Sequence, residues 1–413
     1  MGSVILGLDG VPFGLIKKYS SEGILPNINS VLENGTFVRM ESSIPDVSST
    51  AWSSVITGKN PGEHGIFGFI EVNPANYEFR FPNFNDLKTS PFWTGRKAAI
   101  INVPQTFPAK IENGLLVSGF VALDLERSVY PASLIPKLRS MDYRVDVDSN
   151  LAHESIDIFM DDLFATLEAR NRFFKYAWEL EDWDIFYFVF TETDRLNHFL
   201  FDAWDDASHK YHGVFTEFYR RIDDSIGRIL EKIAGSQPVY IHSDHGFCPL
   251  KTEFYINRWL QENGFLEFNS TDPKTIMEIN PDSKAFALDP GRIYINSKDR
   301  FPSGGVNPSD VEKIKTDIRE GLLKLETESM SPIMRILDGN DIFRGPESSR
   351  APDLVAIGER GYDIKSLVAV DGLYGKRHFR GMHTQDDAFI ISSTRDDRIT
   401  EPFHVEKIAD LIL

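Results

Sequence analysis

Residues 4–10 read Val4-Ile5-Leu6-Gly7-Leu8-Asp9-Gly10, a continuous apolar run that ends on an acid. Two later stretches repeat the pattern: the apolar run 185–190 leads to Asp194, and the run 239–242 leads to Asp244. Continuous apolar runs of this length are typical of strands that are covered on both faces, as in a parallel α/β sheet. Because ligands bind outside the carboxyl ends of such strands, we expect the three acids to converge at one edge of the sheet.

Strand-like and helix-like segments alternate along the whole chain. Strands are expected near 3–8, 36–41, 98–103, 114–119, 185–190, 237–242, 353–357 and 387–393, and helices near 26–34, 49–57, 155–180, 208–234, 255–263, 308–325 and 404–412. This alternation predicts an α/β fold with a doubly wound, mostly parallel central sheet flanked by helices.

Residues 265–350 differ from the rest because Pro, Asp, Ser and Gly become frequent there. We interpret this segment as an inserted cap lobe, and residues 1–264 and 351–413 as the catalytic core. An insertion at the carboxyl edge of the sheet would overhang a site at that edge and select the substrate.

Charge and hydropathy restrict the partners of the protein. The chain carries 44 Lys and Arg against 62 Asp and Glu, which gives a formal net charge of −18. This charge repels polyanions, so duplex nucleic acid is not expected as a partner. A small phosphate ester is compatible with it because bound divalent cations can dominate the local potential. No apolar stretch is long enough to span a bilayer, so no membrane partner is expected.

The compartment is inferred from two features. The chain enters its first expected strand without a recognisable export signal, and Cys248 is its single cysteine. One cysteine permits no internal disulfide, which fits a reducing compartment. We therefore expect the protein to be cytoplasmic.

Carboxylates and imidazoles follow the apolar runs at spacings that suit metal binding. Asp194 and His198 are four residues apart, so a helical turn would place both on one face. Asp244 and His245 are adjacent at a strand end, where the alternative is that Asp244 caps a turn. His383 precedes the apolar run 388–391 and is either a further ligand or an ordinary loop residue.

A hydroxyl-rich segment, residues 45–58, is expected to turn into a short helix. Its sequence is Pro-Asp-Val-Ser-Ser-Thr-Ala-Trp-Ser-Ser-Val-Ile-Thr-Gly. The amides and the positive dipole end of that helix would favour an anion, and a nearby metal would lower the pKa of a serine. The alternative is an ordinary Ser/Thr helix cap.

Together these motifs resemble the alkaline phosphatase superfamily, and within it the type I phosphodiesterase/nucleotide pyrophosphatase family. The resemblance rests on Asp9-Gly10, Ser48 upstream of residues 57–66 (Thr-Gly-Lys-Asn-Pro-Gly-Glu-His-Gly-Ile), Asp194-x-x-x-His198, Asp244-His245-Gly246 and His383. It spans residues 4 to about 393, and implies an alkaline phosphatase-like core.

The resemblance also implies the roles of these residues. One metal site would consist of Asp9, Asp244, His245 and the Ser48 oxygen, and the other of Asp194, His198 and His383. Family members most often carry two zinc ions, and manganese or iron also suit mixed carboxylate and imidazole ligands. Ser48 would be the nucleophile, because the family's Thr or Ser lies ten residues before the glycine at position 58; Ser49 is the alternative. His64 matches a residue that is common in the family, and no chemical role is assigned to it.

The implied reaction is hydrolysis of phosphate diesters, nucleotides among them, through a phosphoseryl intermediate at a two-metal site. Two departures are visible: Ala51 stands where many relatives have a phosphate-binding Asn, and no arginine matches the one that holds a phosphomonoester. Arg195, Lys376 and Arg377 are candidate anion contacts, each interpreted as a solvated surface charge.

Three alternatives share the core. The chain could be a phosphomonoesterase or phosphomutase, a phosphonatase resembling phosphonoacetate hydrolase, or a metal-binding homologue without activity. The absence of an arginine that would hold a phosphomonoester favours a diester as substrate. The chain retains every metal ligand that the resemblance implies, which argues against a homologue without activity.

Overall fold

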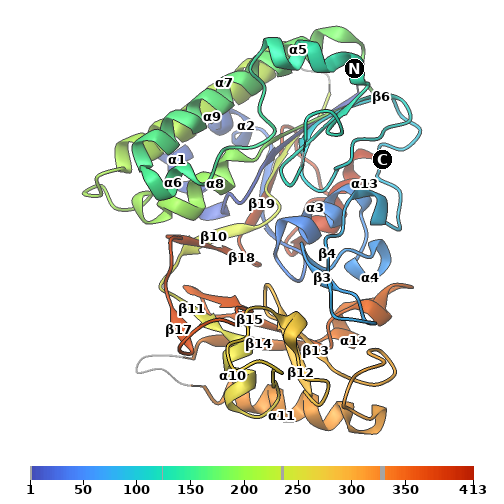
Figure 1. Ribbon diagram of the computed structural model, residues 1–413. Helices are drawn as coiled ribbons and strands as arrows, with labels where there is room; N and C mark the ends of the chain where they lie inside the picture. The colour runs from blue at the N-terminus through green and yellow to red at the C-terminus, as the bar shows by residue number, and fades with distance from the viewer. Residues whose placement is uncertain (1, 123, 234–236, 326–330) are drawn as a thin grey trace.

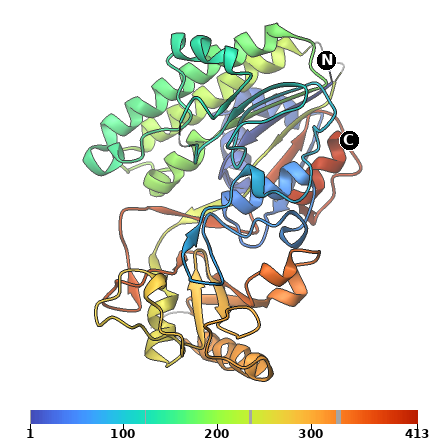
Figure 2. The same cartoon turned by 45° about the vertical axis from the view of Figure 1, so that its right-hand side comes forward.

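The computed structural model describes residues 2–122, 124–233, 237–325 and 331–413. Figure 1 shows two lobes, a larger one built on a central sheet between helices and a smaller one built on short sheets. Both chain termini lie on the larger lobe, and Figure 2 shows the smaller lobe below the carboxyl edge of the large sheet.

The central sheet has nine strands in the order β20-β2-β19-β9-β1-β8-β5-β6-β7. Its strands are β1 (Ser3–Leu8), β2 (Thr36–Glu41), β5 (Ala98–Val103), β6 (Gly114–Ser118), β7 (Val129–Tyr130), β8 (Ile185–Phe190), β9 (Val239–His242), β19 (Ala388–Ser392) and β20 (Phe403–His404). The run β9-β1-β8-β5-β6 is parallel, whereas β19 pairs antiparallel with β9 and β2, and β7 antiparallel with β6. The predicted mostly parallel sheet is therefore confirmed.

Helices cover both faces of this sheet. One face carries α1 (Phe13–Ser21), α2 (Pro26–Leu32), α5 (Ile135–Ser140), α6 (Leu151–Glu154), α7 (Ile156–Leu180), α8 (Glu192–Leu200) and α9 (His212–Lys232), and the other α3 (Ser48–Thr57), α4 (Pro61–His64) and α13 (Ile408–Ile412). Alternate residues of β8 serve the two cores: Phe186, Phe188 and Phe190 pack on the first face, and Ile185, Tyr187 and Val189 on the second. Burial on both faces explains why the strand sequences are apolar without interruption.

The smaller lobe contains two short sheets. The first, ordered β12-β13-β15-β14, consists of β12 (Ala285–Leu288), β13 (Arg292–Ile295), β14 (Ile333–Asp338) and β15 (Leu354–Gly358). The second, ordered β16-β11-β17, consists of β11 (Thr252–Tyr255), β16 (Tyr362–Lys365) and β17 (Tyr374–Gly375), and the lobe's helices are α10 (Ile256–Glu262), α11 (Val311–Leu323) and α12 (Gly339–Ile342).

The expected insertion 265–350 lies within this lobe, together with β11 and α10 before it and β15 to β17 after it. The strand expected near 353–357 is β15, which joins this lobe rather than the central sheet. The assignment of residues 1–264 and 351–413 to one core domain remains a prediction.

Two small elements complete the architecture. A ribbon of β10 (Gly246–Pro249) and β18 (Gly381–Thr384) connects the lobes, and β3 (Glu71–Val72) pairs with β4 (Phe79–Arg80). None of the helices in the described ranges is long and apolar enough to cross a membrane.

Candidate metal centre

The acids that follow the central strands meet at one edge of the sheet. Leu8 of β1 pairs with Phe190 of β8, and Gly7 pairs with His242 of β9, so the three strands end at nearly the same level. Asp9 follows β1, Asp194 lies in the first turn of α8, and Asp244 follows β9. All three carboxylates are buried. The expected convergence is therefore present.

The first group of ligand atoms surrounds the imidazole of His245. Its Nε2 lies 3.7 Å from Asp9 Oδ1 and 3.4 Å from Asp244 Oδ2. The hydroxyl oxygen of Ser48 lies 3.3 Å from the same nitrogen. These four side chains are the set that the family resemblance implied for one metal site.

The second group combines Asp194, His198 and His383. Asp194 Oδ1 lies 3.4 Å from Nε2 of each histidine, and the two Nε2 atoms are 3.0 Å apart. Ligand atoms about 2 Å from a zinc ion in tetrahedral geometry are separated by distances of this size.

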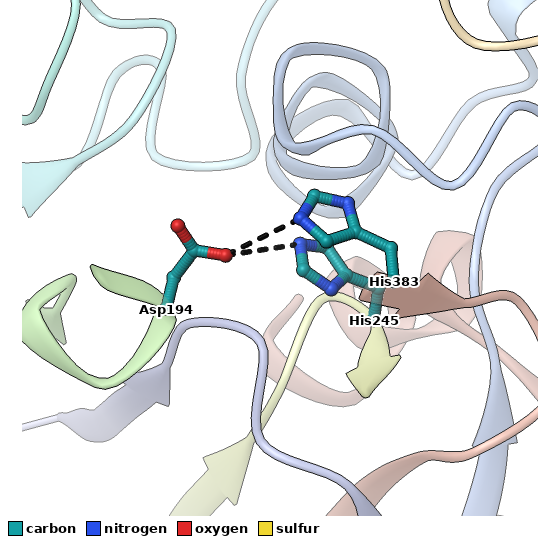
Figure 3. A group of neighbouring side chains, drawn as sticks. All are labelled: Asp194, His245 and His383. Atoms are coloured by element: carbon teal, nitrogen blue, oxygen red, sulfur yellow. Dashed lines mark ion pairs between the residues drawn. The ribbon is translucent and has the colours of Figure 1, made fainter. Parts of the chain in front are cut away.

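The two groups are adjacent. Figure 3 shows Asp194 facing both His245 and His383, whose rings are stacked with centroids 3.7 Å apart. Asp194 Oδ1 is 4.0 Å from His245 Nε2. Candidate ligand sets of this centre include Asp9 with Asp244 and His245, and Asp194 with His245 and His383.

Backbone carbonyls orient two of the imidazoles. Nδ1 of His245 lies 3.0 Å from the carbonyl of Gly246, and Nδ1 of His383 lies 3.0 Å from the carbonyl of Asp46. When Nδ1–H donates to a carbonyl, the lone pair of Nε2 is directed at the centre, as in histidines that bind a metal.

Several carboxylate oxygens of the centre lack a hydrogen-bond donor. Both oxygens of Asp9, Oδ1 of Asp194 and Oδ2 of Asp244 are buried without a partner in the described structure. A buried carboxylate oxygen without a donor is costly, and a bound cation would satisfy all four atoms. The residues present therefore fit divalent cations.

The protonation states agree with this interpretation. Burial, followed by repulsion from Asp244 and Asp194, raises the pKa of Asp9 well above its usual value. Burial lowers the pKa of His198 and of His245 to about 3, so both imidazoles are neutral ligands at neutral pH. Although burial opposes it, the nearby His198, His383 and Arg195 hold the pKa of Asp194 below its usual value.

Helix α3 carries Ser48 as its first residue. The preceding residue, Val47, occupies the cap position in an extended conformation, and no side chain caps the helix. Ser48 is therefore not an ordinary helix cap, and its hydroxyl points to His245 instead. The hydroxyl of Ser49 is buried without a hydrogen-bond partner. His64 donates or accepts a hydrogen bond at 3.0 Å to Ser54 of the same helix, so it anchors α3 rather than the centre.

Arg195 was interpreted as a solvated surface charge, and this is wrong. Its side chain is 20% exposed and donates three hydrogen bonds to Asp146, the shortest at 2.7 Å, and one of 3.3 Å to Asp194 Oδ2. Arg195 thus holds the outer oxygen of Asp194 while the inner oxygen faces the histidines. Sequence reasoning missed Asp146, which lies 49 residues from Arg195 in the chain.

A cavity of about 310 Å³ opens from the centre toward the smaller lobe. His198 and His383 lie on its inner side, and strands β15 and β16 form part of its outer wall. The ring of Phe379 packs on His198 with centroids 4.4 Å apart. The cavity has the position and size of a site for the organic part of a substrate.

Comparisons with known proteins agree with this geometry. A family model described as type I phosphodiesterase / nucleotide pyrophosphatase matches residues 3–386. No curated protein sequence shows a significant match. Phosphonoacetate hydrolase from Sinorhizobium meliloti 1021, solved with phosphonoformate, is similar in structure at 16% identity and a TM-score of 0.63, over 100% of this chain and 95% of that one. Murine ectonucleotide pyrophosphatase / phosphodiesterase 5 is similar at 11% identity and a TM-score of 0.58, over 100% of this chain and 94% of that one.

Proposed function

Because the chain belongs to the type I phosphodiesterase/nucleotide pyrophosphatase family and is a hydrolase of phosphoric ester bonds, we propose that it cleaves phosphate diesters through a phosphoseryl intermediate on Ser48. One observation carries this proposal: the Ser48 hydroxyl lies 3.3 Å from His245 Nε2, within a group of buried carboxylates whose oxygens lack donors. A cation bound beside a nucleophile in that position would favour its ionised form.

Two divalent cations, most simply zinc, are proposed as cofactors. Asp9, Asp244, His245 and Ser48 would hold one, and Asp194, His198 and His383 the other. Cations bound there supply positive charge that favours the ionised serine oxygen and the charge on the departing oxygen.

The residues of the chain then perform two displacements. Ser48 Oγ loses its proton to solvent and forms a bond to phosphorus as the bond from phosphorus to the leaving oxygen breaks, and the leaving oxygen takes one proton from solvent, so that no net proton is gained or lost in this step. Water oxygen next forms a bond to phosphorus as the Ser48 Oγ–phosphorus bond breaks, which returns the serine and releases a phosphomonoester. The positive end of the α3 dipole lies at Ser48 and favours the anionic phosphate.

The charge around the centre supports a diester in preference to a monoester. A monoester carries a second negative charge that needs its own cation. Arg195, the arginine beside the centre, is already paired with Asp146 and Asp194. Monoesterase or phosphomutase activity, and phosphonate cleavage, are the competing reactions on this core.

The test is hydrolysis of bis-p-nitrophenyl phosphate beside p-nitrophenyl phosphate. Metal-free protein is reconstituted with zinc or with manganese, and Ser48→Ala is compared with Ser49→Ala, a matched control one residue along the same helix. We expect preference for the diester that Ser48→Ala abolishes and Ser49→Ala preserves. Preference for the monoester would replace the proposal with a phosphatase or mutase, and no turnover of either ester by metal-loaded protein would favour phosphonates or a binding role.

We also propose that the protein acts in the cytoplasm on small phosphate esters. The single Cys248 and the acidic net charge support this location and this partner class. Fractionation of expressing cells checks it, and recovery outside the cytoplasmic fraction would contradict it.

A further inference from the structure

The wall of the cavity beside the metal centre carries an unusual set of charges. Five acids line it, namely Asp46, Asp289, Glu359, Asp363 and Asp386, against two cationic side chains, Arg360 and Lys365. The acids outnumber the cations on a surface that would otherwise be expected to attract an anionic substrate.

Both cations are already engaged by carboxylates. Lys365 Nζ lies 2.7 Å from Asp363 Oδ2, and the two side chains are only 18% and 14% exposed. Arg360 Nη2 lies 2.7 Å from Asp386 Oδ1. The partly buried Lys365 attracts a further anion weakly because its own partner cancels most of its field, and Arg360, in a pair that is 46% and 49% exposed, is weakened both by its partner and by solvent screening.

More than one acid acts on Lys365. Asp289 of the same wall adds negative charge near Lys365 beyond that of Asp363, and Glu253 behind the wall adds less, being the smaller contribution and itself paired with Arg377 at 2.9 Å. At the metal centre, the three carboxylates of Asp9, Asp194 and Asp244 together with the single charge of a diester would balance two divalent cations. Little positive field would then remain to hold a second anionic group in the cavity.

We propose that this cavity binds the organic group of the diester and selects a group that carries no negative charge, such as an amino alcohol or a polyol. The inference rests on the proposed function and narrows its substrate class: it disfavours nucleoside polyphosphates and esters that carry a carboxylate. Phe69, Met334 and Phe379 give the cavity apolar surface for the hydrocarbon part of such a group.

Three p-nitrophenyl phosphate diesters of equal size test the selection. Their second ester group is 2-aminoethyl, 2-hydroxyethyl or carboxymethyl, which carry a charge of about +1, 0 and −1 at neutral pH. Binding to zinc-loaded Ser48→Ala protein is measured by calorimetry, and turnover of the same esters by wild-type enzyme is measured through p-nitrophenol release. We expect the carboxymethyl ester to bind at least roughly tenfold more weakly than the other two.

Asp363→Asn gives the sharper comparison. This change leaves Lys365 without its nearest carboxylate. The ratio between the dissociation constant of the carboxymethyl ester and that of the 2-hydroxyethyl ester should therefore fall several-fold. Lys365→Met should raise this ratio of dissociation constants, and it provides a second variant if Asp363→Asn does not fold. Asp272→Asn is the matched control, because Asp272 and Lys274 form a pair of the same 2.7 Å length that is 76% and 62% exposed.

The outcomes separate this inference from the proposed function. Weak binding of the carboxymethyl ester that Asp363→Asn relieves and Asp272→Asn does not would support the charge selection, even if no diester is turned over. Equal binding of all three esters, or tightest binding of the carboxymethyl ester, would overturn it. Diester turnover with equal binding would leave the proposed function intact and refute the selection alone.

Discussion

Replacing Arg170 by methionine should destabilise the folded protein because it leaves the buried carboxylate of Glu192 without its ion-pair partner. Arg170 in α7 and Glu192 at the start of α8 are both fully buried. One guanidinium nitrogen donates to Glu192 Oε2 and to Thr191 Oγ1, each at 2.8 Å, and the other donates to the Val145 carbonyl at 2.8 Å. Arg170→Met removes these donors and leaves the Glu192 carboxylate buried without its counter-charge.

The size of the effect follows from that burial. Breaking a buried ion pair by removing one partner costs about 3–5 kcal/mol. Burial raises the pKa of Glu192 even with Arg170 present, and loss of Arg170 would raise it further. An acid whose pKa is raised in the folded state costs stability as pH rises above its unfolded value near 4.5, by up to about 1.4 kcal/mol per unit. The deficit of Arg170→Met should therefore be larger at pH 8 than at pH 5.5.

Urea unfolding of the wild type, Arg170→Met, Glu192→Gln and the double variant measures this free energy at both pH values. The double variant should recover most of the loss at pH 8, because no buried charge remains. Arg221→Met is the control: it breaks an exposed pair with Glu217 at 2.9 Å and should cost less than about 1 kcal/mol. A loss below about 1 kcal/mol for Arg170→Met at pH 8, or no recovery in the double variant, would refute the reasoning.

Three further predictions concern the centre. Chelation of bound metal should lower the thermal midpoint of unfolding and zinc should restore it, because buried carboxylates such as Asp9 lose their counter-charge; scanning calorimetry that finds no shift would contradict this. His383→Ala should reduce bound zinc from about two ions to about one per chain by elemental analysis, and an unchanged content would remove His383 from the ligand set. His64→Ala should reduce diester kcat by roughly tenfold at unchanged zinc content, because it frees Ser54 of the helix that carries Ser48; an unchanged kcat would show that this contact does not position the nucleophile.

The central sheet could be predicted because a strand that is buried on both faces consists of apolar residues throughout, which is visible in its own sequence. Runs such as 185–190 are apolar throughout since alternate side chains enter opposite cores. The run near 353–357 is equally apolar, yet β15 pairs with β13 and β14 in the smaller lobe. A run of apolar residues specifies a strand but not its partners, because pairing depends on contacts between distant segments.

The position of the candidate ligands could be predicted for a related reason. Asp9 and Asp244 come just after β1 and β9, and Asp194 lies in the first turn of the helix that follows β8, so the topology brings all three to one edge. Residues that act through a distant partner could not be predicted in this way. Arg195 appears in sequence as one more charge on a helix, and only the position of Asp146 reveals that it is held against Asp194.

The ribbon of β10 and β18 links the candidate metal centre to the cavity wall that we propose selects the substrate. Strand β10 begins one residue after the candidate ligand His245, and its Phe247 pairs with the candidate ligand His383 of β18. The chain continues from β10 into β11 of the smaller lobe, and returns from β17 into β18. Two candidate ligands therefore lie at the connection to the smaller lobe, whereas Asp9 follows β1 of the central sheet and Asp194 lies in α8. On the proposed selection, we expect changes in the cavity wall at β15 and β16 to alter which organic group is accepted without moving Asp9 and Asp194, and changes in the ribbon to affect metal binding and substrate selection together.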